Sequence, residues 1–180
     1  DDRSVSIAAR LMERGIQVRV TDRRTELSGI DLPRGSVIVT RADNPTFANL
    51  TDVISEETKN LDLDLNSIAS GYGAGELPDW GGEHFRLLVK PQIAILSHSG
   101  FNSYDVGSSW WSIDHYLGVR HSQINASRFS NVDLRRYNTI IVPDSYREMS
   151  DAEVALLRDW VGQGGTLISH AGSVSQLAKE

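Results

Sequence analysis

The chain has 180 residues, a formal net charge of -6, and the balance of apolar and charged residues that is typical of globular proteins. An acidic chain without a basic stripe is not expected to bind nucleic acid, and no apolar run approaches the ~20 residues that span a bilayer. The complete lack of cysteine excludes disulfides, thiolate nucleophiles and cysteine-ligated zinc.

The N-terminal half is predicted to alternate helix and strand. Apolar side chains recur at helical spacing over residues 5–12, which predicts a first helix. Residues 16–21 alternate apolar and polar side chains and residues 35–40 form a short apolar run, so both are predicted as strands. Asn44 followed by Pro45 has the pattern of a capped helix start, so a second helix is predicted to begin there.

A glycine-rich segment is the predicted boundary between two parts of the chain. Residues 61–65 alternate leucine and aspartate, which is compatible with an exposed strand. Residues 71–82 hold five glycines and a proline and are predicted to be a linker. It separates an N-terminal α/β segment (1–82) from an α/β core (83–180), and the two are expected to pack as one compact unit.

The second half carries the strongest strand and helix signals. Apolar runs predict strands at 92–97, 138–143 and 166–169, and residues 107–117 are predicted to be helical. Ser150, followed three positions later by a glutamate, predicts a capping box. Apolar strands separated by helices are typical of a sheet covered on both faces, so we predict an α/β fold with a mostly parallel sheet that includes all five predicted strands.

Polar side chains follow three of the predicted strands at the point where each ends. They are Ser97, His98 and Ser99 after the first, Asp144 and Ser145 after the second, and Ser169 and His170 after the third. Because the carboxyl ends of parallel strands meet at one edge of a sheet, these groups are expected to converge. They could form a Ser-His-Asp hydrolase site, or they could be capping residues at helix starts.

Other site patterns are weaker. The segment 169–173 does not match the G-x-S-x-G elbow of serine hydrolases, and the five histidines lack the H-E-x-x-H and H-x-x-E spacings of zinc peptidases. Trp110 and Trp111 point about 100° apart on a helix, so both cannot face one ligand. Together with Trp80, they leave a carbohydrate-binding module as an alternative function.

Several segments have the sequence patterns of one known family. In the second half they are Leu87–Leu96 (LLVKPQIAIL), Ser112–Ser122 (SIDHYLGVRHS), Tyr137–Asp144 (YNTIIVPD) and Leu157–Leu167 (LRDWVGQGGTL), and residues 11–20 and 32–39 add to them. Together these segments resemble the C-terminal region of large bacterial zinc carboxypeptidase-like proteins. That region is similar to a class I glutamine amidotransferase domain appended to the peptidase.

The resemblance implies a flavodoxin-like three-layer sandwich in a periplasmic or secreted parent protein. The implied partner is an upstream peptidase domain of the same polypeptide, and any zinc would be held there, so no cofactor is expected in this chain. Amidotransferases place a cysteine after the strand that corresponds to residues 166–169, and the nearest equivalent here is His170. Neither peptidase nor glutaminase chemistry is therefore expected.

These observations lead to one main hypothesis and two alternatives. We expect a non-catalytic accessory domain that serves in docking, ligand binding or interdomain packing. Its candidate ligand-binding residues are Ser97, His98, Asp144, Ser145, His170 and Gly172. The alternatives are a serine-type hydrolase built from the strand-end group and a carbohydrate-binding module.

Overall fold

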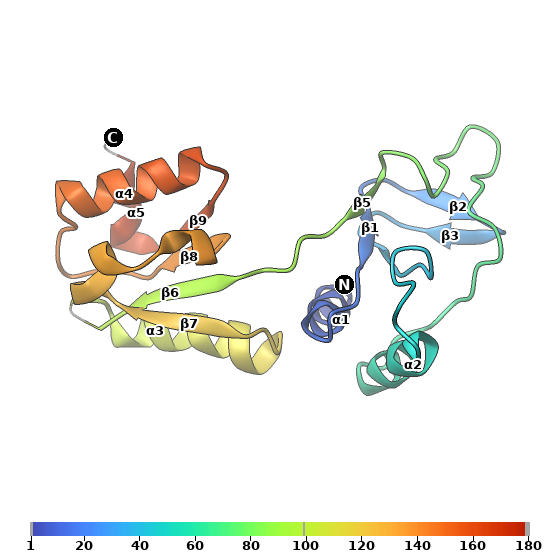
Figure 1. Ribbon diagram of the computed structural model, residues 1–180, viewed down its shortest axis with the longest axis horizontal. Helices are drawn as coiled ribbons and strands as arrows, with labels where there is room; N and C mark the ends of the chain where they lie inside the picture. Colours follow the sequence, from blue (N-terminus) through green and yellow to red (C-terminus); the bar gives the residue numbers. More distant parts are fainter. Residues whose placement is uncertain (1, 99, 179–180) are drawn as a thin grey trace. The chain divides into compact units, whose positions relative to one another are not determined.

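The computed structural model describes residues 2–98 and 100–178, so Ser99 of the predicted strand-end group lies outside the described residues. The chain divides into two compact units, Asp1–Lys90 (unit 1) and Pro91–Glu180 (unit 2), whose elements are labelled in Figure 1. Within the described residues, no helix is both long and apolar enough to cross a bilayer.

Unit 1 combines two helices with small antiparallel sheets. Its helices are α1 (Asp2–Glu13) and α2 (Leu50–Asn60), and its strands are β1 (Arg19–Thr21), β2 (Thr25–Leu27), β3 (Ile30–Leu32), β4 (Val37–Ile38) and β5 (Phe85–Leu87). One sheet has the order β4-β1-β5, and β2 pairs with β3. The apolar face of α1, including Ile7 and Leu11, packs with Leu50 and Val53 of α2 into one buried cluster.

The prediction that residues 16–21 and 35–40 join the parallel sheet is wrong. Both are strands over part of their length, but β1 pairs with β4 antiparallel, with Val20 opposite Val37. A short apolar run shows that a strand is buried, but it does not specify the direction of the neighbouring strand. The connection from β1 to β4, residues 22–36, forms the β2–β3 hairpin and not a crossover helix, and it returns the chain antiparallel to β1.

Asn44 does not cap a helix, contrary to prediction. Its side chain accepts a hydrogen bond from the Gln17 amide at 2.7 Å and donates to the Thr40 carbonyl at 3.0 Å. These bonds tie the segment after β4 to the segment before β1, and α2 begins only at Leu50. Residues 61–65, predicted as a strand, follow α2 as a turn and an irregular segment.

The glycine-rich segment 71–82 folds against unit 1 instead of forming an extended linker. The Ala74 amide donates to the Glu26 carbonyl at 3.2 Å, and Trp80 N donates to Gly71 O at 2.7 Å. A Cβ on Gly73 would collide with the Leu77 carbonyl oxygen, so glycine is required there for close packing. Because β5 follows this segment and pairs with β1, the division between the units falls after Lys90 and not after residue 82.

Unit 2 is built on a four-stranded parallel sheet. Its strands are β6 (Ile93–Ser97), β7 (His121–Asn125), β8 (Thr139–Val142) and β9 (Thr166–Ser169), in the order β7-β6-β8-β9. Its helical elements are α3 (Ser103–Trp110), the π-helical turn η1 (Trp111–Tyr116), the 3-10 turns η2 (Ala126–Asn131) and η3 (Leu134–Arg136), α4 (Asp151–Gly162) and α5 (Ala171–Leu177). Figure 1 shows α3 on one side of this sheet and α4 on the other.

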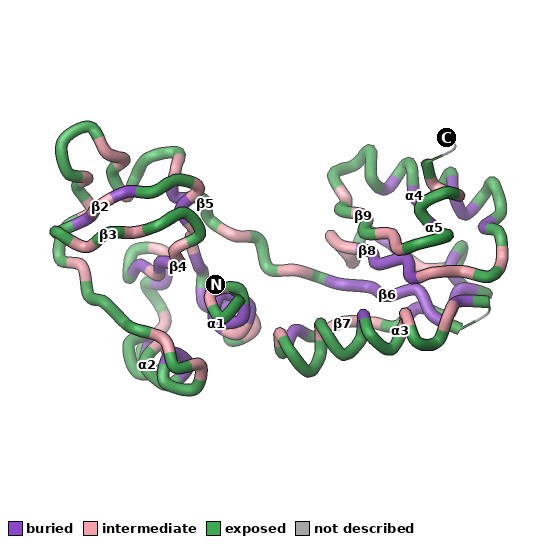
Figure 2. Tube along the Cα trace, turned by 180° about the vertical axis from the view of Figure 1, so that it is seen from behind, coloured by how far each residue is buried: buried purple, intermediate pink, exposed green. Residues whose placement is uncertain are grey.

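Three of the four parallel strands were predicted from their apolar runs, and this part of the fold prediction is confirmed. Every residue of β6 is buried, as the purple tube in Figure 2 shows. Alternate residues of β6 and β8 pack with Leu157 and Trp160 of α4 in one core. β7 was missed because its sequence is polar except for Ile124, its one buried residue.

The start of α4 confirms the predicted capping box and adds an ion pair to it. Ser150 Oγ accepts from the Glu153 amide, while the Glu153 carboxylate accepts from the Ser150 amide at 2.9 Å. The guanidinium of Arg147 donates to both oxygens of Glu153, at 2.8 and 3.0 Å. These donors stabilise the carboxylate and lower the pKa of Glu153 to about 2, with the Arg147 bonds as the main cause.

We predict that Glu153→Gln lowers the free energy of unfolding by about 1–3 kcal/mol at pH 7, because it removes a charged acceptor from a half-buried arginine. Since the pKa of Glu153 is lowered in the folded state, its stabilisation is present above the usual glutamate pKa. It is lost as the pH falls toward about 2. Urea unfolding followed by circular dichroism should therefore show a difference from the wild type that shrinks between pH 5 and pH 2.

Asp151→Asn is the matched control, because Asp151 lies in the same first turn of α4 and is exposed. Its effect should stay within about 0.5 kcal/mol. A loss in Glu153→Gln that is independent of pH would contradict the role assigned to the ion pair.

Candidate functional site

The edge of the parallel sheet where β6, β8 and β9 end is the candidate functional site. These strands are neighbours, and the register aligns Ile95 with Ile141 and Val142 with Ser169, so their carboxyl ends lie along one edge. Numbered along the chain within unit 2, the strand order is 2-1-3-4: the second strand is added on one side of β6, and the third and fourth are added on its other side. Open α/β sheets bind ligands at such a switch point.

Asp144 and Gly172, two of the predicted residues, are in direct contact. Asp144 follows β8 by two positions, and its Oδ1 accepts a hydrogen bond from the Gly172 amide at 2.9 Å. Gly172 lies in the first turn of α5, directly after Ala171, which has a φ of +42°. A Cβ on Gly172 would approach Asp144 Oδ1 to 2.9 Å, so glycine permits this close contact.

Asp105, in the first turn of α3, joins the predicted residues into a network. Its Oδ2 accepts from the Asp144 amide at 2.8 Å and lies 3.5 Å from Nδ1 of His170. One carboxylate therefore connects α3 with the ends of β8 and β9. Asp105 was not predicted from the sequence because the helix start was predicted at residue 107, although Asn102 supplies an N-cap that accepts from the Tyr104 amide.

The serines of the strand-end group have structural surroundings. Ser97 Oγ donates to the Ile124 carbonyl at 3.4 Å, and Ser145 Oγ donates to the Arg147 carbonyl at 2.8 Å. Ser169 Oγ is buried and has no hydrogen-bond partner among residues 2–98 and 100–178. These arrangements tie Ser97 and Ser145 to backbone carbonyls, as expected for residues that shape strand ends and turns.

Ser97 and His98 line a cavity of about 300 Å³ between β6, β7 and α3. Its other lining residues are Phe101, Ser103, Val106, Gly107, Trp110 and Gln123. The lining does not include Asp144, Ser145, His170 or Gly172. Ser97 and His98 thus belong to the cavity, Asp144, His170 and Gly172 belong to the Asp105 network, and Ser145 belongs to neither. His98 is exposed and has a φ of +59°, a conformation in which non-glycine residues are strained.

The two adjacent tryptophans have different surroundings, in agreement with the expectation that both cannot face one ligand. Their rings are tilted by 59° with centroids 6.4 Å apart. Trp110 lines the cavity, whereas Trp111 stacks on His115 with a centroid distance of 3.9 Å. Trp110 is therefore the tryptophan of this pair that can contact a ligand in the cavity.

Histidines near carboxylates occur at two places in unit 2. His170 lies beside Asp105, and His121 Nδ1, which is buried, lies 4.0 Å from Asp114 Oδ1. Among residues 2–98 and 100–178, no group of three or more histidine, aspartate and glutamate side chains has the arrangement that could hold a metal ion. Each pair supplies fewer protein ligands than the three of a catalytic zinc site.

The Asp105–His170 pair can orient an imidazole. A carboxylate that faces one ring nitrogen favours the tautomer in which that nitrogen carries the proton, and the other nitrogen can then accept a proton or hydrogen bond. The cavity offers an apolar wall formed by Phe101, Val106 and Trp110. The cavity is lined separately from this pair, and its apolar wall together with its polar lining residues suits a small ligand that has an apolar part and a polar end. Comparisons of the chain with protein-family models, curated proteins and solved structures found no match.

We predict that Asp105→Ala lowers the free energy of unfolding by about 1–3 kcal/mol, because it leaves the Asp144 amide without its acceptor. Asp105→Asn should cost less, since an amide oxygen can still accept this bond while the charge beside His170 is lost. Urea unfolding and amide hydrogen exchange at Asp144 provide the measurements. Equal losses in both variants would show that the charge, and not the hydrogen bond, holds the strand ends together.

Proposed function

We propose that the chain is a non-catalytic accessory part of a zinc carboxypeptidase-like protein, and that the strand-end region of unit 2 binds a ligand or docks a neighbouring segment. The sequence resemblance described above supports the family. The strand order 2-1-3-4 of unit 2, with helices on both faces, supports a flavodoxin-like sandwich. An exported parent protein, with its zinc in an upstream peptidase domain, is part of the same proposal.

The observation that carries the proposal is the backbone conformation of Ala171. Enzymes of several α/β families mount a nucleophile on a strained turn between a strand and a helix. The turn between β9 and α5 has this form, and its left-handed residue is Ala171, one position beyond His170. The side chain at this position is a methyl group, which cannot act as a nucleophile.

The surroundings of the turn also favour a binding role. In an elbow, the amide that follows the nucleophile donates to the oxyanion of the intermediate. Here the corresponding amide, that of Gly172, already donates to Asp144. A carboxylate in this position would also repel a developing negative charge. The turn therefore lacks the nucleophile and has its oxyanion donor occupied.

A serine-type hydrolase is the second candidate, favoured by the Asp105–His170 pair. This pair has the composition of a base held by a carboxylate, with Nδ1 3.5 Å from Oδ2. The adjacent Ser169 Oγ is buried without a hydrogen-bond partner in the part of the chain that the structure describes, and Ser97 and Ser145 bond to backbone carbonyls. A hydrolase would require the hydroxyl of Ser97 or Ser145 to leave its carbonyl, or that of Ser169 to gain a base as partner, on substrate binding.

Activity assays of the purified chain separate the two candidates. The substrates are glutamine and peptides with a free C-terminus, each assayed with and without added zinc, and we expect no turnover. Turnover that disappears in His170→Ala or His98→Ala would overturn the accessory role and support the hydrolase. Turnover that both variants retain would indicate a contaminating enzyme, and the expectation for this chain would stand.

A further inference from the structure

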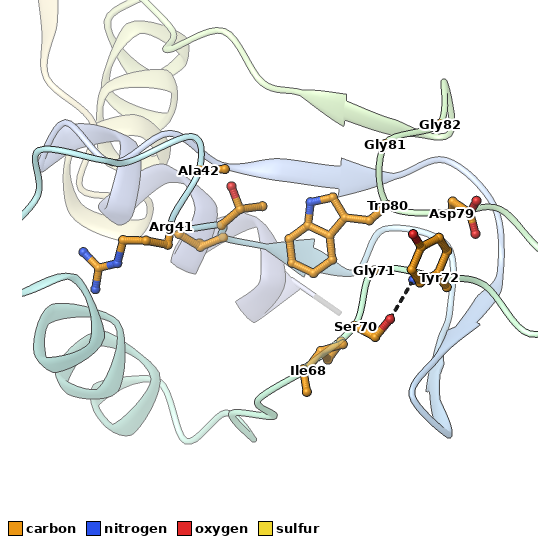
Figure 3. Close-up of a pocket in the computed structure, with 13 residues that line it drawn as sticks. Arg41, Ala42, Ile68, Ser70, Gly71, Tyr72, Asp79, Trp80, Gly81 and Gly82 are labelled. Carbon is orange, nitrogen blue, oxygen red and sulfur yellow. Dashed lines mark hydrogen bonds between the residues drawn. The ribbon is translucent and has the colours of Figure 1, made fainter.

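Unit 1 contains an open groove of about 850 Å³ at the folded glycine-rich segment. Its walls are residues 39–42, which follow β4, and residues 68–72 and 79–82. Figure 3 shows the indole of Trp80 face-on in the middle of this groove, with Arg41 on one side and Tyr72 and Asp79 on the other. The volume lies within the range of about 300–1,000 Å³ that is usual for ligand sites.

The indole of Trp80 is held as a flat platform. The ring of Phe85 from β5 stacks against it at a centroid distance of 6.4 Å and an angle of 14°. A Cβ on Gly71 would lie 2.7 Å from Trp80 Cβ, so this glycine allows the backbone to pack against the side chain. With Phe85 and Gly71 fixing its position, the indole can receive a ligand with little loss of conformational entropy.

Hydrogen bonds hold the walls of the groove in place. Gly73 N donates to Asp79 Oδ1 at 2.7 Å, and Tyr72 N donates to Ser70 Oγ at 3.3 Å. Thr25 Oγ1 donates to the Pro78 carbonyl and anchors the same segment to β2. The loop is therefore closed on itself and fastened to the hairpin, which makes the groove a preformed feature.

Charged and hydroxyl groups surround the platform. Arg41 and Asp79 carry opposite charges on opposite sides of Trp80, and the hydroxyls of Ser70 and Tyr72 lie on the Asp79 side. Arg41 donates to the Phe47 carbonyl at 2.6 Å through Nη1, and this bond orients its guanidinium. A guanidinium has five N–H donors, so one such bond does not use them all. An aromatic face with hydrogen-bonding groups at its border suits a ring that is apolar on its faces and polar at its edge.

We infer that this groove binds a neutral oligosaccharide, with one sugar ring stacked on Trp80. The axial C–H groups of a pyranose form an apolar face that packs on an indole, and its equatorial hydroxyls reach donors and acceptors at the border. Arg41 can donate to these hydroxyls, and the carboxylate of Asp79 can accept from them. The groove is open to solvent, so further rings linked to the stacked one can extend out of it.

Other ligand classes fit the same groups less well. A singly charged ligand over Trp80 would be attracted by one of Arg41 and Asp79 and repelled by the other, so its charge would gain little net stabilisation there. A purely apolar ring would desolvate the border groups without offering hydrogen bonds in exchange. Of the three tryptophans that the sequence offered for carbohydrate binding, the geometry therefore favours Trp80.

The test uses fluorine NMR of the chain labelled with 5-fluorotryptophan. The chain has four tryptophans and should therefore give four fluorine resonances. The probes are hexasaccharides of β-1,4-linked glucose, β-1,4-linked N-acetylglucosamine and α-1,4-linked glucose, titrated to 10 mM. At least one should shift a single resonance, which the variant Trp80→Phe identifies as that of Trp80. Absence of a shift with every probe, or a shift only at the other tryptophans, would overturn the inference.

Variants give a second measurement with a matched control. Trp80→Leu keeps an apolar contact with Phe85 but removes the flat face, and it should weaken binding about tenfold, as loss of an aromatic stacking contact does. Trp111→Leu changes an exposed tryptophan of unit 2 and should leave the affinity unchanged. Equal affinity of the wild type and Trp80→Leu would overturn the inference.

Arg41→Ala and Tyr72→Ala keep the test decisive if Trp80→Leu does not fold, because both side chains are exposed. Each should weaken binding several-fold, and full affinity in both would contradict the assigned site. A shift of the Trp80 resonance with N-acetyltyrosine amide but with no saccharide would overturn the inference. It would show that the groove binds an aromatic peptide side chain and not a sugar. The groove lies in unit 1, so a negative result would leave the proposed role of unit 2 unaffected.

Discussion

The parallel pairing of β6 with β8 is the constraint on which the arrangement of unit 2 depends. All five residues of β6 are buried, so this strand can lie only in the interior of a sheet that is covered on both faces. Because β7 lies on one side of β6 and β8 on the other, the chain adds its second strand on one side of β6 and then crosses over to add the third on the other side. The cavity and the Asp105 network lie at the carboxyl ends of the strands, where this change in strand order occurs.

The sequence predicted those elements whose apolar side chains are consecutive, and it failed where polar side chains act through tertiary contacts. The runs at 92–97 and 166–169 became β6 and β9, whereas the polar β7 was missed because only Ile124 is buried. Asn44 has the residue type of a helix cap, yet it bonds to a segment 27 positions away in the chain. Such long-range bonds leave no periodic pattern in the sequence.

The same distinction applies to the candidate site. The sequence located Asp144 and Gly172 because each follows a predicted strand, and the structure places them in a direct hydrogen bond. Asp105, which links Asp144 to His170, lies on a helix whose start was predicted too late in the chain. The residues that end strands were thus accessible to prediction, but the carboxylate that connects them depends on how α3 packs beside β6.

Two non-glycine residues at the strand ends, His98 after β6 and Ala171 after β9, have a positive φ, and the strained backbone has a different role at each. A non-glycine residue in the left-handed conformation costs of the order of 1 kcal/mol or more, so its surroundings must hold it. At His98 the strained residue lines the cavity, so the conformation there helps to shape the cavity at the end of β6. At Ala171 the side chain is inert, so the conformation there serves the backbone. It turns the Gly172 amide toward Asp144 and allows Ser173 Oγ to donate to the Pro143 carbonyl at 2.7 Å, which fastens α5 to the end of β8.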